Sequence, residues 1–119
     1  MIRSYRDLDV YQRAFALSLS IHSLAKSFPK DEVYGLTSQI KRSSKSICAN
    51  IAEGFAKQKT SKAEFKRFLM IAFGSCTETL VWIDYCNELS YISQDEFETL
   101  HEGYEHVSKM LLKLHDNIR

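Results

Sequence analysis

The chain has 119 residues, 45% of them hydrophobic, with one proline, four glycines and a formal net charge of +1. This length suits one domain, residues 1–119, and leaves no room for a second, while the scarcity of proline and glycine argues against hairpins and long loops. The charge is uneven: residues 38–67 hold eight Lys or Arg and two Asp or Glu, whereas residues 68–107 hold eight Asp or Glu and no Lys or Arg.

The first predicted helix spans residues 9–28. Apolar residues recur every three or four positions from Val10 to Phe28, which is typical of an amphipathic helix, and Pro29 cannot continue it. Phe15 and Leu19 lie one turn apart beside this apolar face. They either widen the core or form an apolar edge that contacts another molecule.

The second predicted helix spans residues 32–57, and Asp31 is placed to cap its first turn. Its core face carries the large apolar residues Val33, Leu36, Ile40, Ile47, Ile51 and Phe55. Its opposite face is basic in the first half and small in the second, with the residues Lys41, Arg42, Lys45, Ala49, Ala52 and Ala56. One helix therefore faces two different environments.

The third and fourth predicted helices span residues 61–90 and 94–117. Each begins with a serine followed by a glutamate three residues later, Ser61 with Glu64 and Ser93 with Glu96, which is the pattern of a capping box. Because the connections are short, consecutive helices should be antiparallel neighbours. The sequence therefore predicts an all-α fold, an up-down-up-down antiparallel four-helix bundle.

Side chains suited to catalysis are not arranged in a recognisable pattern. The chain has no H-E-x-x-H, P-loop, G-x-G-x-x-G or nucleophile-elbow motif. A di-iron bundle needs Glu-x-x-His on two helices, and only Glu98 with His101 fits. We therefore expect no enzymatic activity, no cofactor and no metal.

The cysteines and the hydropathy pattern bear on the compartment. Cys48, Cys76 and Cys86 are odd in number and lack C-x-x-C spacing, so we expect buried thiols in a reducing environment. The N-terminus carries charges where a signal peptide would be apolar, and the longest uncharged apolar run, residues 68–77, is half of a membrane span. We expect a cytoplasmic protein without a membrane partner.

A basic cluster is the first candidate site. It comprises Lys41, Arg42, Lys45, Lys57, Lys59, Lys62, Lys66 and Arg67. These residues could contact several phosphates of a nucleic acid, or bind an acidic protein partner. They could also be solvated, or form ion pairs with the acidic half of the same or a neighbouring chain.

Small and apolar residues outside the core form the second candidate site. We predict an oligomer interface made of Phe15, Leu19, Ala49, Ala52, Ala56, Met110 and Leu112, because small faces allow close approach and apolar edges favour burial. A further set of polar residues, Gln39, Ser46, Asn50, Glu53 and Glu78, is predicted to form a structural network, in which Arg42 or another basic residue of the second helix pairs with Glu78. A ligand pocket at these positions is the alternative.

A family resemblance rests on one motif within the second helix. The motif comprises Gln39-Ile40-Lys41-Arg42, Ser46-Ile47 and Asn50-Ile51-Ala52-Glu53-Gly54. Supporting positions are Asp7-Leu8 with Val10, Phe28-Pro29 before Glu32, Tyr34-Gly35-Leu36, and Phe68-Leu69, Ile71-Ala72, Gly74-Ser75 and Glu78. Together they resemble the four-helix proteins encoded by intervening sequences of bacterial 23S rRNA genes, a family similar in fold to the accessory variability protein of diversity-generating retroelements.

The resemblance implies a four-helix protomer, a ring-like homopentamer and no established enzymatic activity, and its retroelement relatives add a nucleic-acid role. We therefore predict a non-enzymatic, homo-oligomeric accessory protein that binds RNA or DNA through the basic residues of the second helix and the following loop. The alternative is an oligomeric protein-protein scaffold without nucleic-acid contact, and a bundle that binds a small molecule is the third possibility.

Overall fold

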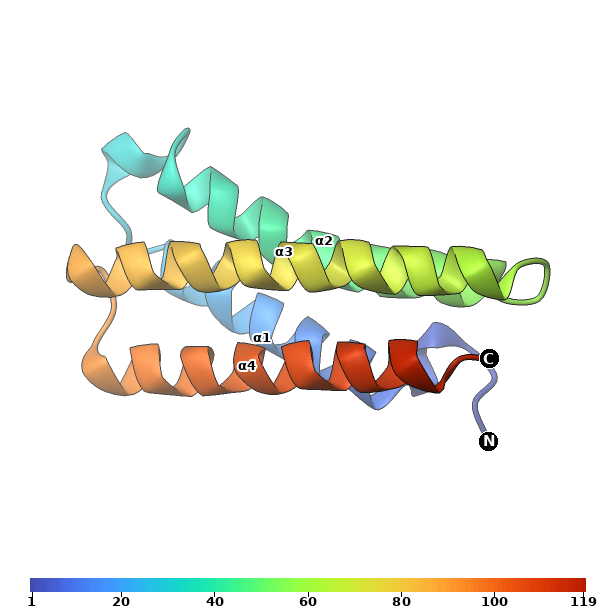
Figure 1. Cartoon of the computed structure of the whole chain (residues 1–119). Helices are drawn as coiled ribbons and strands as arrows, with labels where there is room; N and C mark the ends of the chain where they lie inside the picture. The colour runs from blue at the N-terminus through green and yellow to red at the C-terminus, as the bar shows by residue number, and fades with distance from the viewer.

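The computed structural model describes all residues 1–119 and confirms the all-α four-helix bundle. The helices are α1 (Asp9–Ala25), α2 (Leu36–Lys57), α3 (Lys62–Glu88) and α4 (Gln94–Asn117), with short 3-10 turns η1 (Tyr5–Asp7) and η2 (Lys30–Glu32). Consecutive helices run in opposite directions, and α1 and α2 lie behind α4 and α3 in the view of Figure 1. The molecule measures 44 × 25 × 21 Å. No helix is long and apolar enough to cross a membrane.

The core lies on the axis of the bundle, where all four helices contribute apolar side chains. The largest fully buried residues include Ile21, Ile40, Ile47, Ile51, Leu69, Ile83, Tyr104 and Leu111. Together with the other buried positions of each helix they recur mostly at three- and four-residue intervals, so each helix turns one stripe inward. The apolar side chains whose spacing predicts the helices are thus the ones that hold the bundle together.

The second helix begins later than predicted. Residues 33–35 are not part of a helix and separate η2 from α2. The Glu32 carboxylate, and not that of Asp31, accepts a hydrogen bond from the Leu36 amide at 3.1 Å. The other oxygen of Glu32 accepts from the Tyr91 hydroxyl at 2.8 Å. Because this glutamate bridges two loops and caps α2, Val33 falls outside the helix and is 52% exposed instead of entering the core.

The third helix begins at the predicted serine, but only one of the two hydrogen bonds of a capping box is present. Ser61 accepts from the Glu64 amide at 3.1 Å. The Glu64 carboxylate does not return the bond, because Arg67 holds it at 2.8 Å and the Ser61 amide already donates to the Lys57 carbonyl. Ser93 and Glu96 form the complete capping box at the start of α4.

The end of α3 contains a serine in a backbone conformation that favours glycine. Ser90 has a φ of 60°, its amide donates to the Asn87 carbonyl, and the Tyr91 amide donates to the Cys86 carbonyl at 2.8 Å. This pair of bonds is the Schellman arrangement, which satisfies the last carbonyls of a helix and places a left-handed residue after it. Side chains other than glycine pay a steric cost there.

Replacing this serine should therefore stabilise the fold. We expect Ser90→Gly to raise the free energy of unfolding by about 0.5–1 kcal/mol, because the glycine relieves the left-handed strain without removing a helical residue. Equilibrium unfolding in urea measures this change. Ser93→Gly, three residues away, should act in the opposite direction because it removes the α4 cap. An unstable Ser90→Gly variant would show that the serine side chain has a role of its own.

Candidate functional site

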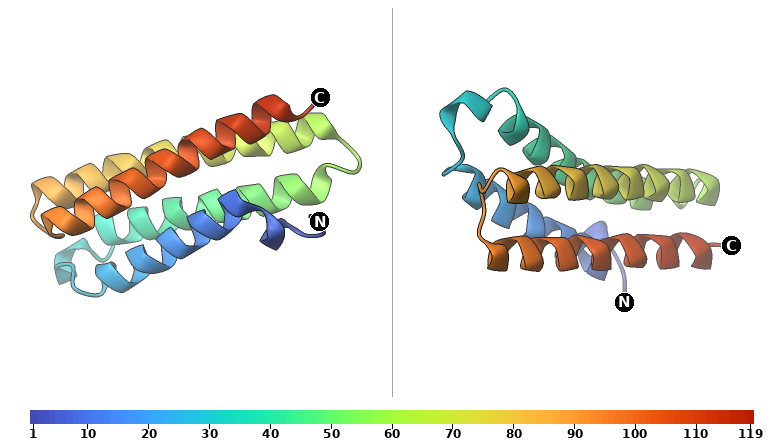
Figure 2. Two further views of the ribbon diagram at one scale, coloured as in Figure 1. Left: turned by 90° about the horizontal axis from the view of Figure 1, so that it is seen from below. Right: turned by 60° about the vertical axis from the view of Figure 1, so that its left-hand side comes forward.

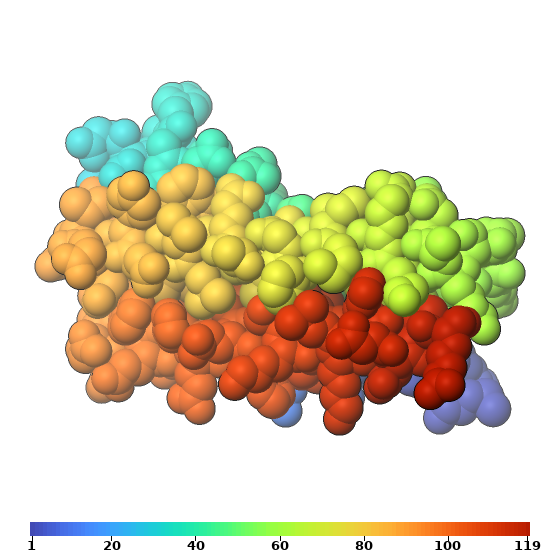
Figure 3. All heavy atoms as spheres, viewed as in Figure 1, coloured from blue at the N-terminus to red at the C-terminus, as the bar shows by residue number.

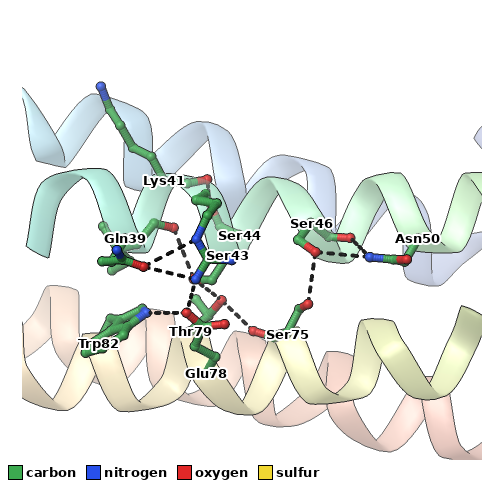
Figure 4. Close-up of polar contacts among 12 residues, drawn as sticks. Gln39, Lys41, Ser43, Ser44, Ser46, Asn50, Ser75, Glu78, Thr79 and Trp82 are labelled. Atoms are coloured by element: carbon green, nitrogen blue, oxygen red, sulfur yellow. Dashed lines mark hydrogen bonds and ion pairs between the residues drawn. The ribbon is translucent and has the colours of Figure 1, made fainter. Parts of the chain in front are cut away.

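Polar side chains join α2 to α3 along the face where these two helices meet (Figure 4). The expected pair of Arg42 with Glu78 is present, and Arg42 also donates to the Gln39 side-chain oxygen at 3.0 Å. The Trp82 indole N–H donates to the same oxygen of Glu78 at 3.0 Å. This ion pair is therefore held from both helices.

A ladder of small hydroxyl groups continues the contact toward the middle of the bundle. The Thr79 hydroxyl donates to Ser43 at 2.9 Å, and Ser46 and Ser75 lie 3.0 Å apart (Figure 4). Asn50 donates from its amide to the Ser46 carbonyl at 2.8 Å. These groups satisfy one another at the helix contact, so the ladder fixes the register of α2 against α3.

The structure brings together four of the five predicted network residues. Glu53 is the exception, since it is exposed and takes no part in the ladder. The sequence prediction also missed members of the network: Ser43, Ser75, Thr79 and Trp82. The four-residue spacing of Ser75 and Thr79, on the side of α3 that faces α2, is the signal that could have found two of them.

The predicted basic cluster separates into two surfaces. Arg42 and Lys57 lie fifteen residues apart on α2, roughly 22 Å along its axis. The first surface, formed by Lys41, Arg42 and Lys45, borders an open depression of about 580 Å³. We call it the helix surface. The second comprises Lys57, Lys59, Lys62, Lys66 and Arg67 around the α2–α3 loop, and we call it the loop surface.

Acidic neighbours neutralise part of each surface. Arg42 is paired with Glu78, and Glu64 binds Arg67 at 2.8 Å and Lys57 at 4.0 Å. The hydrogen bond from Arg67 lowers the pKa of Glu64 and so favours its ionised form. Both cations also lie 4.6 Å from the centre of the Phe68 ring. The remaining lysines, Lys41, Lys45, Lys59, Lys62 and Lys66, have no acidic partner within 4.0 Å.

Charge is separated along the length of the molecule. The end that holds the α2–α3 loop and both chain termini is basic, and the opposite end, formed by the last turn of α3 and the first turns of α4, is acidic (Figure 1). The acidic side chains there are Asp84, Glu88, Asp95, Glu96 and Glu98. The uneven distribution of charge along the sequence therefore places basic and acidic residues at opposite ends of the long axis of the bundle.

An apolar groove between α1 and α2 gathers most of the predicted oligomer interface. Its volume is about 400 Å³, and its lining includes Phe15, Leu19, Ala49 and Ala52 together with Tyr11. Phe15 and Leu19 are exposed, so they form an edge and do not widen the core. Ala56 lies one turn beyond Ala52 on the same face and is exposed. We call this feature the α1/α2 groove.

The other two predicted interface residues do not lie in this groove. Met110 is half-buried in a separate depression between α4 and the start of α1, beside Leu8 and Val10. Leu112 is exposed on α4. Met110 and Leu112 therefore lie on α4, apart from the edge that Phe15 and Leu19 form on α1.

The cysteine thiols are buried singly in different parts of the core. Burial raises the pKa of Cys48 to about 11, that of Cys76 to about 12 and that of Cys86 to about 11. Thiols protonated at neutral pH are weak nucleophiles. No three His, Cys, Asp or Glu side chains gather where they could hold a metal ion.

Comparisons with known proteins agree with one another. The model of the family described as 23S rRNA-intervening sequence protein matches residues 6–113. A crystal structure of a protein with unknown function from the S23 ribosomal protein family of Bacteroides thetaiotaomicron is similar to the chain, with a TM-score of 0.80 and 27% sequence identity. The similarity covers 91% of this chain and 96% of that one. The comparison with curated proteins gives no match.

Proposed function

The chain belongs to the family of 23S rRNA-intervening sequence proteins, and on this basis we propose that it is a non-enzymatic, homo-oligomeric accessory protein that binds RNA or DNA. The nucleic-acid contact is the loop surface, formed by the end of α2, the α2–α3 loop and the start of α3.

The observation that carries this proposal is the set of unpaired lysines at one end of the bundle. Lys59, Lys62 and Lys66 lack an acidic partner, although Glu64 lies within the same turn and pairs with Lys57 and Arg67. Lysines left free in this way can exchange their counterions for phosphates, which is the main source of affinity in nucleic-acid binding. A phosphate backbone supplies the repeated negative charge that several such lysines need.

A titration of nucleic acid at two salt concentrations tests the proposal. We expect fluorescence anisotropy of a labelled structured RNA and a labelled DNA duplex to show binding that weakens as NaCl rises. Each phosphate contact contributes about 0.9 to the slope of log affinity against log salt on duplex DNA, or about 0.7 on single strands. The slope therefore counts the lysines that are used.

Charge reversal identifies the surface. The double variant Lys59→Glu, Lys62→Glu should lower affinity roughly tenfold or more and flatten the salt dependence by about two contacts. The matched control is Lys26→Glu, Lys30→Glu, which makes the same charge change at two exposed lysines near the opposite end. Equal effects of the two variants would contradict a local contact.

A scaffold that binds another protein is the second candidate. The acidic end of the molecule and the paired state of Arg42, Lys57 and Arg67 favour it. An oligomer that ignores both RNA and DNA at low salt would overturn the nucleic-acid proposal and favour the scaffold. In either case we propose a cytoplasmic location, in keeping with its buried, unpaired cysteines.

A further inference from the structure

We propose that the outward face of α3 of one copy occupies the α1/α2 groove of the next copy, so that copies join head to tail. This inference rests on the proposed homo-oligomer and assigns the two different surfaces that form its contact. The occupant of the groove is thus a second copy of this chain.

The outward face of α3 is apolar although nothing in the protomer covers it. Met70, Ile71, Val81 and Tyr85 are 41%, 40%, 43% and 53% exposed. They lie on the side of α3 directed away from its buried stripe, and Figure 3 shows α3 uncovered along the length of the molecule. Helices that are apolar on both sides are usually sandwiched between neighbours.

Gly74 lies in the middle of this face, and the protomer does not need it there. A Cβ atom added to Gly74 would have no other atom within 4 Å. A glycine lowers the stability of a helix relative to alanine, so an exposed one calls for a reason outside the helix. Close approach of another molecule to the backbone of α3 supplies that reason, and the exposed Phe15 ring at the edge of the groove is a suitable side chain to fill the hollow.

The two surfaces lie at the same height in the bundle. The bond between Ser46 and Ser75 sets α3 against α2, and the bond between Ser18 and Ser44 sets α1 against α2. Counting from these bonds along the antiparallel helices, Gly74 and Phe15 both lie level with Ile47. A rotation about an axis parallel to the bundle keeps every height unchanged. Such a rotation brings α3 of one copy to the groove of the next without any shift along the bundle axis.

The same rotation also matches charges. It keeps α3 antiparallel to α2 of the neighbour, because these helices are antiparallel within each protomer (Figure 2). The acidic last turns of α3, with Asp84 and Glu88, then lie toward the end of the groove that carries Lys45, beside the depression that Lys41 lines. Both lysines lack a partner within the protomer. The acidic partner that Lys41 and Lys45 lack is therefore supplied by the next copy.

The contact is heterologous, since each copy uses one surface to accept and a different one to donate. In the view of Figure 1, α3 lies in front of α1 and α2, and its outward face is the side away from its buried stripe. The groove lined by α1 and α2 and this face of α3 are therefore separate surfaces, and one copy can use both at once. Repetition of such a contact closes into a ring when the rotation divides a full turn.

Mixing two variants tests this arrangement. Gly74→Arg blocks the donor face and leaves the groove intact, whereas Ala49→Arg blocks the groove and leaves α3 intact. Both positions are exposed, so neither change disturbs the core. By light scattering after size exclusion, each variant alone should be a monomer, and their mixture should form a dimer of about twice the 13.8 kDa chain mass. Thr99→Arg, at an exposed position of α4, is the matched control and should keep the wild-type mass.

The outcomes separate this inference from the proposed oligomer. A monomeric wild-type protein would overturn the oligomer itself. An oligomeric wild type with an equally oligomeric Gly74→Arg variant would overturn the assigned contact alone. Two monomeric variants that fail to form a dimer on mixing would show that the contact is symmetric, and so would exclude the head-to-tail arrangement.

Discussion

Gly54→Ala is expected to lower the free energy of unfolding by about 1–3 kcal/mol. A Cβ atom at this position would lie 2.8 Å from Phe68 Cβ and 3.1 Å from Phe65 Cδ1. Phe68 Cβ is attached directly to the backbone of α3, so the clash can be relieved only by moving the two helices apart. Since α2 and α3 form the most extensive helix pair and hold the hydroxyl ladder, their separation also weakens hydrogen bonds.

Gly74→Ala is the matched control for this prediction. It makes the same chemical change in the partner helix, where the added methyl group meets nothing. Helix propensity alone should then raise stability by up to about 1 kcal/mol. Urea unfolding at a protein concentration that keeps the chain monomeric measures both variants. Changes of the same sign would mean that helix propensity, and not the approach of α2 to α3, governs position 54.

Raising the pH above 9 is expected to destabilise the protein steeply. The ordinary pKa of a cysteine thiol is 9.0, and burial raises the folded-state pKa of the three thiols to about 11 or 12. Between these values the unfolded chain releases protons that the folded chain retains, so stability falls as pH rises and is unaffected below about pH 8. Three such groups give a slope approaching about 4 kcal/mol per pH unit.

Thiol substitution separates this effect from general alkaline unfolding. Cys48→Ala should reduce the slope of stability against pH by about one third, while its stability at pH 7 falls slightly through lost packing. Urea midpoints at pH 7, 9 and 10 give the slope. Labelling with iodoacetamide should be slow at pH 8 in the folded protein and fast after unfolding. An unchanged slope in Cys48→Ala would indicate that other groups cause the alkaline transition.

The fold could be predicted because each helix carries its own periodic apolar face, and because short connections leave few ways to pair four helices. The start of α2 was misjudged for a specific reason. Both Asp31 and Glu32 are good residues for a helix N-terminus, and only the tertiary contact of Glu32 with Tyr91 decides which carboxylate caps which turn. A sequence pattern does not contain that contact.

The candidate site shows a similar division. The pair of Arg42 with Glu78 could be predicted, since a charged residue beside the core needs a partner. The hydroxyl ladder was missed because serine and threonine are equally common on exposed faces. Their burial depends on how closely α2 approaches α3, which Gly54 permits. Met110 and Leu112 were grouped with Phe15 and Leu19 because a helical pattern places residues on a face but does not place helices around a bundle.

The axial separation of charge changes what the net charge of the molecule means. Electrostatic fields in water containing 0.1 M salt decay over about 10 Å, whereas the bundle is 44 Å long. A partner approaching one end therefore senses the charge of that end alone. A polyanion that approaches the basic end meets a cationic surface, and a basic protein that approaches the acidic end meets an anionic one, although the chain as a whole is nearly neutral. Only near 0.01 M salt, where the screening distance reaches about 30 Å, do the two ends begin to cancel at a distance.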